Sequence, residues 1–199
     1  ARPREGRAAR RRGNRLAKQE AEANANADGD SHPLPPLVEQ CDTPLEQRTT
    51  VMLRNLPNNY SRAMVLAMLD SEGFAGQYDF IYLPIDFKSR ACLGYAFVNL
   101  VRPEIVAPFW SRFDGFSRWV LPSRKVCGVC WSGPHQGLEA HVERYRNSPV
   151  MHASVPEEFK PMVFAGGRPQ AFPEPGKAPR APRIRNLADG RTLWRPRGA

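Results

Sequence analysis

The order of hydrophobic patterns between residues 49 and 146 is the strongest constraint that this sequence places on its fold. Runs rich in β-branched and aromatic residues are separated by stretches whose apolar residues recur at helical spacing. The predicted strands are residues 49–56, 78–84, 93–100 and 125–131, and the predicted helices begin at Ser61, Pro103 and Gly137. The predicted order is therefore strand, helix, strand, strand, helix, strand, followed by one additional helix.

Local signals support the three predicted helices. Ser61 can cap the first helix, and Pro103 suits the first turn of the second. Apolar residues at positions i, i+3, i+4 and i+7 give the second helix one buried face. These residues are Val106, Phe109, Trp110 and Phe113, and the third helix repeats the spacing with Leu138, His141, Val142 and Tyr145.

Two split βαβ units of this kind predict an α/β (α+β) fold, the ferredoxin-like sandwich. Its four-stranded antiparallel sheet carries two helices on one face and leaves the other face open. The additional helix, from Gly137 to Arg146, directly follows the fourth strand. We therefore expect it to lie over or beside the open face, where it would gate access.

Charge and composition divide the chain of 199 residues, whose net charge is +9, into a domain with two tails. Residues 1–18 hold eight basic side chains against one acidic, and residues 19–48 hold seven acidic against one basic. We predict a disordered segment at 1–48, one domain at 49–150 and an extended, Pro/Arg-rich, mostly disordered tail at 151–199. Basic tails favour polyanionic partners.

The third predicted strand carries two aromatic side chains on one face. Side chains alternate across a strand, so Tyr95 and Phe97 share a face with Asn99. The octamer K/R-G-F/Y-G/A-F-V-x-F/Y on a third strand marks the RNA recognition motif, whose aromatic rings stack on bases. Five positions of the octamer match, from Gly94 to Val98, whereas Leu93 and Leu100 depart from it.

The neighbouring strands extend the predicted platform of rings. If Val51 and Leu53 are buried, Met52 and Arg54 point to the same side as the two rings. The same alternation predicts that Phe80 and Tyr82 lie on the open face, and Arg54, Lys88 and Arg90 are candidates for phosphate contacts. The predicted RNA-binding residues are Tyr95, Phe97, Met52, Arg54, Tyr82, Phe80, Asn99, Lys88 and Arg90.

Several segments together resemble the C-terminal RNA recognition motif of the Mei-two-like family. The resemblance runs from about Thr49 to Phe164 and is most specific in YDFIYLPIDF and the following GYAFVN. It implies binding of single-stranded RNA, control of RNA fate in meiosis and differentiation, and residence in the nucleus, the cytoplasm or both. Longer members of the family carry further RNA-binding domains upstream.

Other functions have weaker support. The spacing of Cys127, Cys130, His135 and His141 approaches that of a zinc knuckle, but the last ligand is wrong in type and position. We expect a buried Cys127 and a half-exposed Cys130 instead, and neither a metal nor a cofactor. The four cysteines do not form a disulfide framework, and no run approaches a membrane span.

No catalytic motif is recognisable, so we expect no enzyme activity. The alternative to RNA binding is a fold of the same type that docks another protein through its sheet or helices. Proline-rich runs such as HPLPPL and APRAPRIR are also possible binding segments for protein partners.

Overall fold

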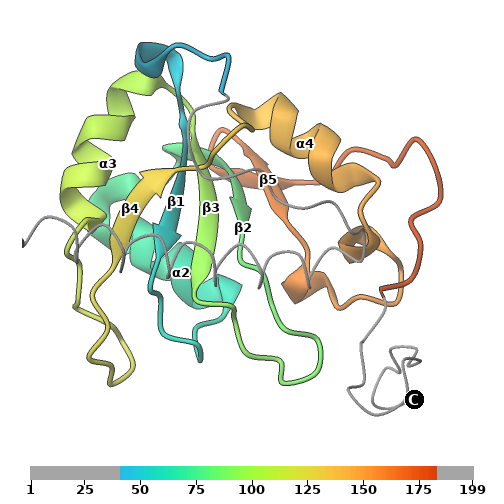
Figure 1. The fold of residues 1–199 in the computed structure, drawn as a ribbon, viewed down its shortest axis with the longest axis horizontal. Helices are drawn as coiled ribbons and strands as arrows, with labels where there is room; N and C mark the ends of the chain where they lie inside the picture. The colour runs from blue at the N-terminus through green and yellow to red at the C-terminus, as the bar shows by residue number, and fades with distance from the viewer. Residues whose placement is uncertain (1–40, 183–199) are drawn as a thin grey trace, which may run out of the picture.

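Figure 1 shows the computed structural model, which describes residues 41–182. The predicted disorder of residues 1–40 and 183–199 concerns segments outside the described residues. The strands are β1 (Thr50–Arg54), β2 (Tyr78–Tyr82), β3 (Tyr95–Leu100), β4 (Gly128–Trp131), β5 (Met162–Ala165) and β6 (Arg168–Gln170), and the α-helices are α2 (Arg62–Leu69), α3 (Val106–Phe113) and α4 (Leu138–Arg146). Single turns of helix are η1 (Leu45–Gln47), η2 (Asp70–Phe74), η3 (Pro103–Ile105), η4 (Pro149–Met151) and η5 (Glu157–Phe159).

The strands of the described residues form one antiparallel sheet with the order β4-β1-β3-β2-β5-β6. Its first four strands, with α2 after β1 and α3 after β3, are the predicted ferredoxin-like sandwich. The central strands are β1 and β3, and Met52 lies opposite Phe97 in their register. The predicted fold class is therefore confirmed, with two additional strands at one edge.

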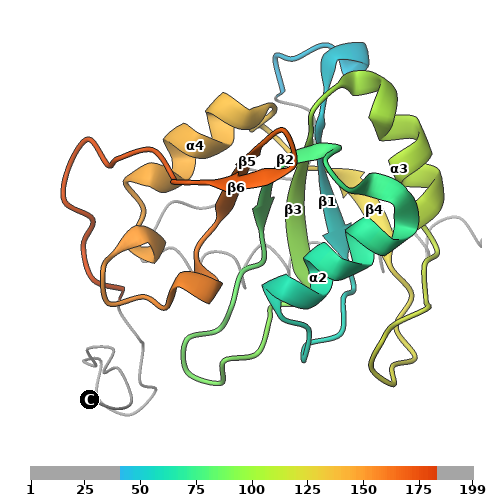
Figure 2. The same cartoon turned by 180° about the vertical axis from the view of Figure 1, so that it is seen from behind.

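The two faces of the sheet carry different helices. Figures 1 and 2 show α2 and α3 on one face and α4 on the other. The ring of Phe109 in α3 packs on Phe74 at a centroid distance of 4.9 Å, and these rings belong to the core with Ile81 and Val98. The additional helix thus covers the face that the two split βαβ units leave bare.

The N-terminus of α2 follows the sequence signal closely. Ser61 has extended backbone angles, and its Oγ accepts a hydrogen bond from the backbone N–H of Met64 at 3.2 Å. Val65, Met68 and Leu69 are the buried side chains of this helix. The cap and the apolar stripe together explain why the helix starts where the sequence predicts.

The predicted extended tail from residue 151 is wrong for its first part. Strand β5 pairs with β2, and the short strand β6 pairs with β5. Phe164 packs edge-on against Tyr78 with ring centroids 5.1 Å apart. Val163 and Phe164 are buried, Met162 is half-buried and Ala165 is exposed, so the centre of this run is part of the packed sheet. The prolines and glycines around this run had suggested disorder. Two of the glycines instead allow the β5–β6 hairpin to lie close to the turn before β2, because a Cβ on Gly167 would lie only 3.1 Å from the Cα of Gly76.

Within residues 41–182, none of the helices is both long enough and apolar enough to cross a membrane.

Candidate nucleic-acid interface

The predicted ring platform is assembled from β1, β2 and β3. Met52 lies directly opposite Phe97, and Arg54 lies directly opposite Tyr95. Residues directly opposite each other in antiparallel strands share a face of the sheet. The prediction that these four side chains lie on one face is therefore confirmed.

The second strand adds its aromatic side chains to the same face. Tyr82 is paired with Phe97, and Phe80 is paired with Asn99, next to an irregularity in the register at the start of β2. Tyr95 contacts Phe97 edge-on with ring centroids 5.7 Å apart. The sheet thus presents a continuous group of rings, as the alternation predicted.

The prediction that this face is open is wrong. Phe80 is fully buried, and Tyr95 and Phe97 expose only 6% and 8% of their surface. Helix α4 lies over the β2 side of the platform, where His141 contacts Phe97 and Tyr145 contacts Tyr82. Because His141 and Tyr145 are four residues apart, both project from the same side of the helix. The helix thus lies over the face, one of the two positions that the sequence predicted, whereas the predicted exposure of the rings is wrong.

Charge placement favours the formation of α4. Glu139 stands in its first turn, and Arg144 and Arg146 stand in its last turn, so their charges complement the helix dipole. Arg146 also pairs with Glu143 one turn earlier, at 3.1 Å. The polar residues leave one apolar stripe, which faces the sheet.

The imidazole of His141 is almost completely buried, with 1% of its surface exposed. Its Nε2 lies 3.4 Å from the hydroxyl of Ser132, and the ring otherwise packs among Phe80, Phe97 and Tyr145. Burial lowers the pKa of His141 to about 4, and nearby His135 and Arg144 act in the same direction. This histidine is therefore neutral at pH 7 and behaves as an aromatic packing residue.

Asn99 holds a buried polar network together below the helix. Its Oδ1 accepts hydrogen bonds from the hydroxyls of Thr49 and Thr50, at 2.8 and 2.6 Å. Its Nδ2 donates to Asp79 at 2.7 Å. Burial raises the pKa of Asp79, whereas the hydrogen bond from Asn99 acts to lower it. The amide of Asn99 thus serves the protein's own fold, although the sequence placed it among the RNA-binding residues.

Gly94 and Lys125 shape the end of the platform next to Tyr95. Gly94 has φ 85°, a conformation that favours glycine, and its carbonyl accepts a hydrogen bond from the N–H of Leu56. The ammonium group of Lys125 donates to the carbonyl of Leu56 at 2.8 Å and to Oδ1 of Asn58 at 2.6 Å. These bonds tie the loop before β4 to the loop after β1.

Lys88 and Arg90 lie in the loop that leads into β3. Both side chains are exposed. The carboxylate of Asp86 accepts a hydrogen bond from the backbone N–H of Lys88 at 2.8 Å, and the N–H of Arg90 donates to the carbonyl of Asp86. The loop is thus a defined turn that presents two cations to solvent.

The cysteines have the predicted environments. Cys127 is buried and Cys130 is half-buried, and burial raises the pKa of the Cys127 thiol to about 12. Within residues 41–182, no group of three or more His, Cys, Asp or Glu side chains is arranged to hold a metal ion.

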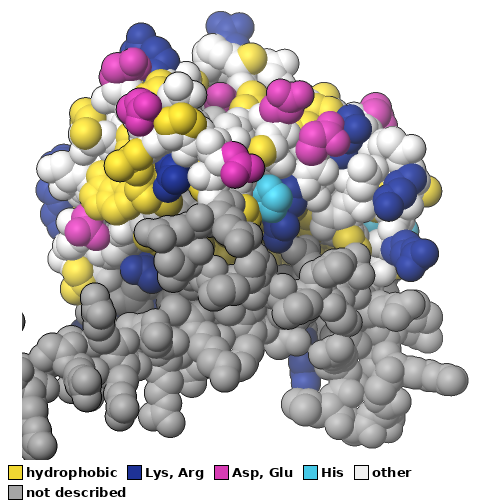
Figure 3. All heavy atoms as spheres, turned by 45° about the horizontal axis from the view of Figure 1, so that its top comes forward, with side chains coloured by type: hydrophobic (Ala, Val, Ile, Leu, Met, Phe, Trp, Pro, Cys, Tyr) yellow, Lys and Arg dark blue, Asp and Glu magenta, His cyan; other side chains and the backbone are white. Residues whose placement is uncertain are grey.

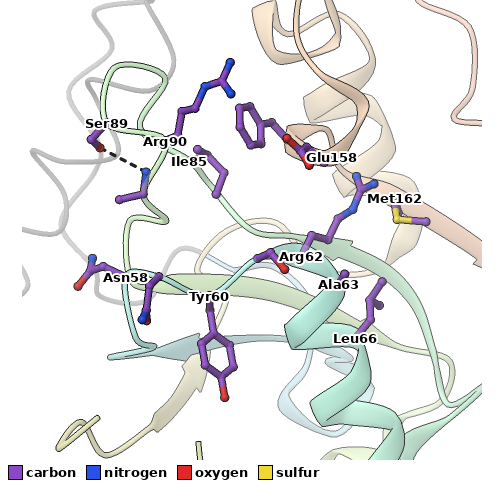
Figure 4. Close-up of a pocket in the computed structure, with 14 residues that line it drawn as sticks. Asn58, Tyr60, Arg62, Ala63, Leu66, Ile85, Ser89, Arg90, Glu158 and Met162 are labelled. Atoms are coloured by element: carbon purple, nitrogen blue, oxygen red, sulfur yellow. Dashed lines mark hydrogen bonds between the residues drawn. The ribbon is translucent and has the colours of Figure 1, made fainter. Parts of the chain in front are cut away.

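A cavity of about 790 Å³ lies away from the rings, between the start of α2, the loop before β3 and η5 (Figure 4). Among the predicted RNA-binding residues, only Arg90 lines it. The guanidinium of Arg62 in its wall donates to the backbone carbonyls of Glu157 and Lys160, and burial lowers its pKa. The guanidinium of Arg62 is therefore used in holding the fold together. The cavity is separate from the ring platform.

Sequence reasoning did not identify three residues that determine the state of the platform. His141 and Tyr145 were recognised as the apolar stripe of a helix, but helical spacing does not specify the surface that the stripe contacts. Gln136 precedes this helix and carries no periodic signal, yet its side-chain amide forms hydrogen bonds with both Thr49 and Thr50. Only the tertiary arrangement shows these roles.

Comparison with known proteins agrees with this geometry. Residues 48–146 match the family model described as RNA recognition motif 2. The chain is 40% identical over 126 residues to Protein MEI2-like 4 of Arabidopsis thaliana, which covers 63% of this chain and 14% of that protein. It is 37% identical over 164 residues to Protein terminal ear1 of Zea mays, which covers 75% of this chain and 23% of that protein.

One solved structure that this chain resembles is the RNA recognition motif of Rna15, at 16% identity and a TM-score of 0.37, covering 44% of this chain and 92% of that chain. The chain spans less than a quarter of the length of the two plant relatives. Its matched residues, 48–146, include all of β1 to β4 and α4. Through this domain the chain belongs to the RNA recognition motif 2 family, which it shares with the Mei2-like proteins.

Proposed function

We propose that this domain binds single-stranded RNA on the sheet face that carries Tyr95 and Phe97. The observation that supports this most directly is the pairing of Tyr95 with Arg54 and of Phe97 with Met52 on the two central strands. Rings on neighbouring strands provide surfaces for successive bases, and each stacked base contributes about 1 to 3 kcal/mol. The cation Arg54, opposite Tyr95, is a candidate to contact the phosphate that joins two stacked bases.

Charge would add attraction rather than base selectivity. Lys88 and Arg90 extend from the loop next to β3 and are candidates for phosphate contacts. On the described part of the molecular surface seen in Figure 3, basic and acidic side chains are interspersed. We therefore assign selectivity to the rings, and we assign the salt-dependent part of the affinity to these loop cations and the basic tails.

The similarity to Mei2-like proteins supports a role in the control of RNA fate. We propose that the domain selects RNA targets for such control, in the nucleus, the cytoplasm or both. Proteins that bind the proline- and arginine-rich segments are proposed as further partners.

A second candidate function is docking of a protein on the same domain without use of the rings. The low exposure of Tyr95 and Phe97 favours it, because a base cannot stack on a ring that is already covered. Replacement of Tyr95 and Phe97 therefore tests both candidate functions.

The test is a selection of binding sequences from a random single-stranded RNA pool, followed by affinity measurements on the full chain. Replacement of both rings by alanine should abolish sequence preference and leave a weak, salt-sensitive remainder. Because these rings are buried, Tyr95→Leu provides a second variant that keeps apolar volume and removes the stacking surface.

Trp110→Leu is the matched control. Trp110 is a half-buried ring of α3, on the opposite side of the sheet, where it contacts Trp131 at 5.3 Å. It should leave the sequence preference unchanged. A preference that survives in a folded Tyr95→Leu variant would refute RNA binding by these rings and favour protein docking.

A further inference from the structure

Two rings of α4 lie on the sheet face in a stacked arrangement. His141 and Tyr145 are nearly parallel, with an interplanar angle of 17° and centroids 6.2 Å apart. Below them, Phe80 is inclined by 18° to Tyr145 and by 34° to His141, at 5.9 and 4.8 Å. Successive bases of a single strand adopt similar stacked positions on aromatic side chains.

We propose that α4 is an autoinhibitory cover whose His141 and Tyr145 occupy the positions of two RNA bases. RNA and α4 then compete for Phe97 and Phe80. This inference rests on the proposed function, since it describes how access to the same face is regulated.

Gln136 is the latch that keeps the cover closed. Its Oε1 accepts hydrogen bonds from the backbone N–H groups of Thr49 and Thr50, at 3.1 and 2.9 Å. Its Nε2 donates to the carbonyl of Thr50 at 2.9 Å. The side-chain amide thereby bonds the backbone at the start of β1 as a neighbouring peptide group would, just before α4 begins.

The latch continues into the sheet through a chain of hydrogen bonds. The backbone N–H of Gly137 donates to the hydroxyl of Thr50 at 2.9 Å, and this hydroxyl donates to Asn99. Thr50 is fully buried, so opening the latch exposes several polar groups that the closed state satisfies. The start of α4 is therefore bound to β1 by polar contacts, and its middle is bound to β2 and β3 by ring contacts.

The chain after α4 also returns to the sheet. Strand β5 pairs with β2, so the helix is connected to the platform on both sides. A helix held in this way has a high effective concentration at the face, and it closes again as soon as RNA leaves. The apparent affinity for RNA is then reduced by the small fraction of molecules in which the cover is open.

Gln136→Ala tests the latch, with Gln47→Ala as its matched control. Gln47 is an exposed glutamine of η1 and takes no part in the contacts between α4 and the sheet. The probe is the random single-stranded RNA pool, labelled with a fluorophore and titrated at fixed salt. We expect Gln136→Ala to bind on the order of tenfold more tightly than the wild type, and Gln47→Ala to bind as the wild type does.

Hydrogen exchange of the α4 amides gives the second readout. Exchange should be faster in Gln136→Ala without RNA, and RNA should accelerate it in the wild type. Two results would refute competition between RNA and α4 while leaving RNA binding intact. One is an unchanged RNA affinity in Gln136→Ala. The other is that RNA does not accelerate hydrogen exchange of the α4 amides in the wild type. If neither the wild type nor Gln136→Ala binds RNA, the proposed function itself fails.

Discussion

His141 of α4 lies against Phe97 of β3, with ring centroids 5.9 Å apart, so that a helix after the fourth strand covers the central aromatic side chain of the third. The contact is made by a neutral imidazole in an apolar environment. Cover and platform are thus coupled through a titratable group, which gives the contact a measurable dependence on pH.

Acidification should destabilise the domain through His141. Its pKa is about 4 in the folded protein and 6.5 ordinarily, so the unfolded state binds more protons between these values. The contribution is fully present above pH 6.5 and is lost as the pH falls towards 4. Between pH 7 and pH 5 the loss is about 2 kcal/mol in the free energy of unfolding. His141→Phe, measured by urea unfolding at both pH values, should show a smaller loss than the wild type. An equal loss would mean that other groups account for the acid sensitivity.

Replacing Asn99 should reveal the buried polar network. Asn99→Ala leaves the hydroxyl of Thr50 without its acceptor and Asp79 without its donor, at a cost of about 1 to 3 kcal/mol. Asn99→Asp should cost more at pH 7, because it places a carboxylate beside Asp79. Protonation of one of the two carboxyls relieves the repulsion, so the difference in the free energy of unfolding between Asn99→Ala and Asn99→Asp should be smaller at pH 5. Chemical unfolding at the two pH values provides the measurement, and a constant difference would contradict the proximity of the charges.

Substitution of Gly94 tests the backbone next to Tyr95. Gly94→Ala forces a side chain into a left-handed conformation at φ 85° and should lower the free energy of unfolding by about 1 to 2 kcal/mol. Gly128→Ala is the control: the structure gives this strand glycine no left-handed φ, and its added Cβ would meet atoms no closer than 3.9 Å. It should be close to neutral. Thermal unfolding of both variants separates backbone strain from the general effect of replacing glycine, and equal changes would argue against strain at Gly94.

The pleat of the strands made much of the platform predictable. The alternation of Val51, Met52, Leu53 and Arg54 was enough to place two side chains in the core and two on the face of Tyr95 and Phe97. A period of two residues is a local property, and the sheet preserved it. The helix pattern from Leu138 to Tyr145 was equally local, and the helix formed as predicted.

The sequence placed the additional helix over or beside the face, but local pattern did not predict which rings it contacts or that it buries them. The apolar stripe of α4 fits any apolar surface, and only the packing of the chain selects the rings of β2 and β3. The hydrogen bonds of Gln136 to β1 join residues more than 80 positions apart in the sequence. Strand β5 was missed for a different reason, because its short apolar run lies among prolines and glycines that signal disorder.

The loop before β3 should contribute affinity without sequence preference. Lys88 and Arg90 are exposed and held by the turn around Asp86, so replacing both with alanine removes two cations without disturbing the core. If both meet phosphates, RNA affinity should fall by a similar factor for all sequences. The slope of log affinity against log salt should then decrease by about 1.4, because each neutralised phosphate of a single strand contributes about 0.7.

Arg102→Ala is the matched control, since Arg102 is exposed just beyond the opposite end of β3 and should leave the slope unchanged. A slope that stays the same in the double variant would place the RNA backbone elsewhere on the domain, and a changed base preference would make this loop part of the selective site.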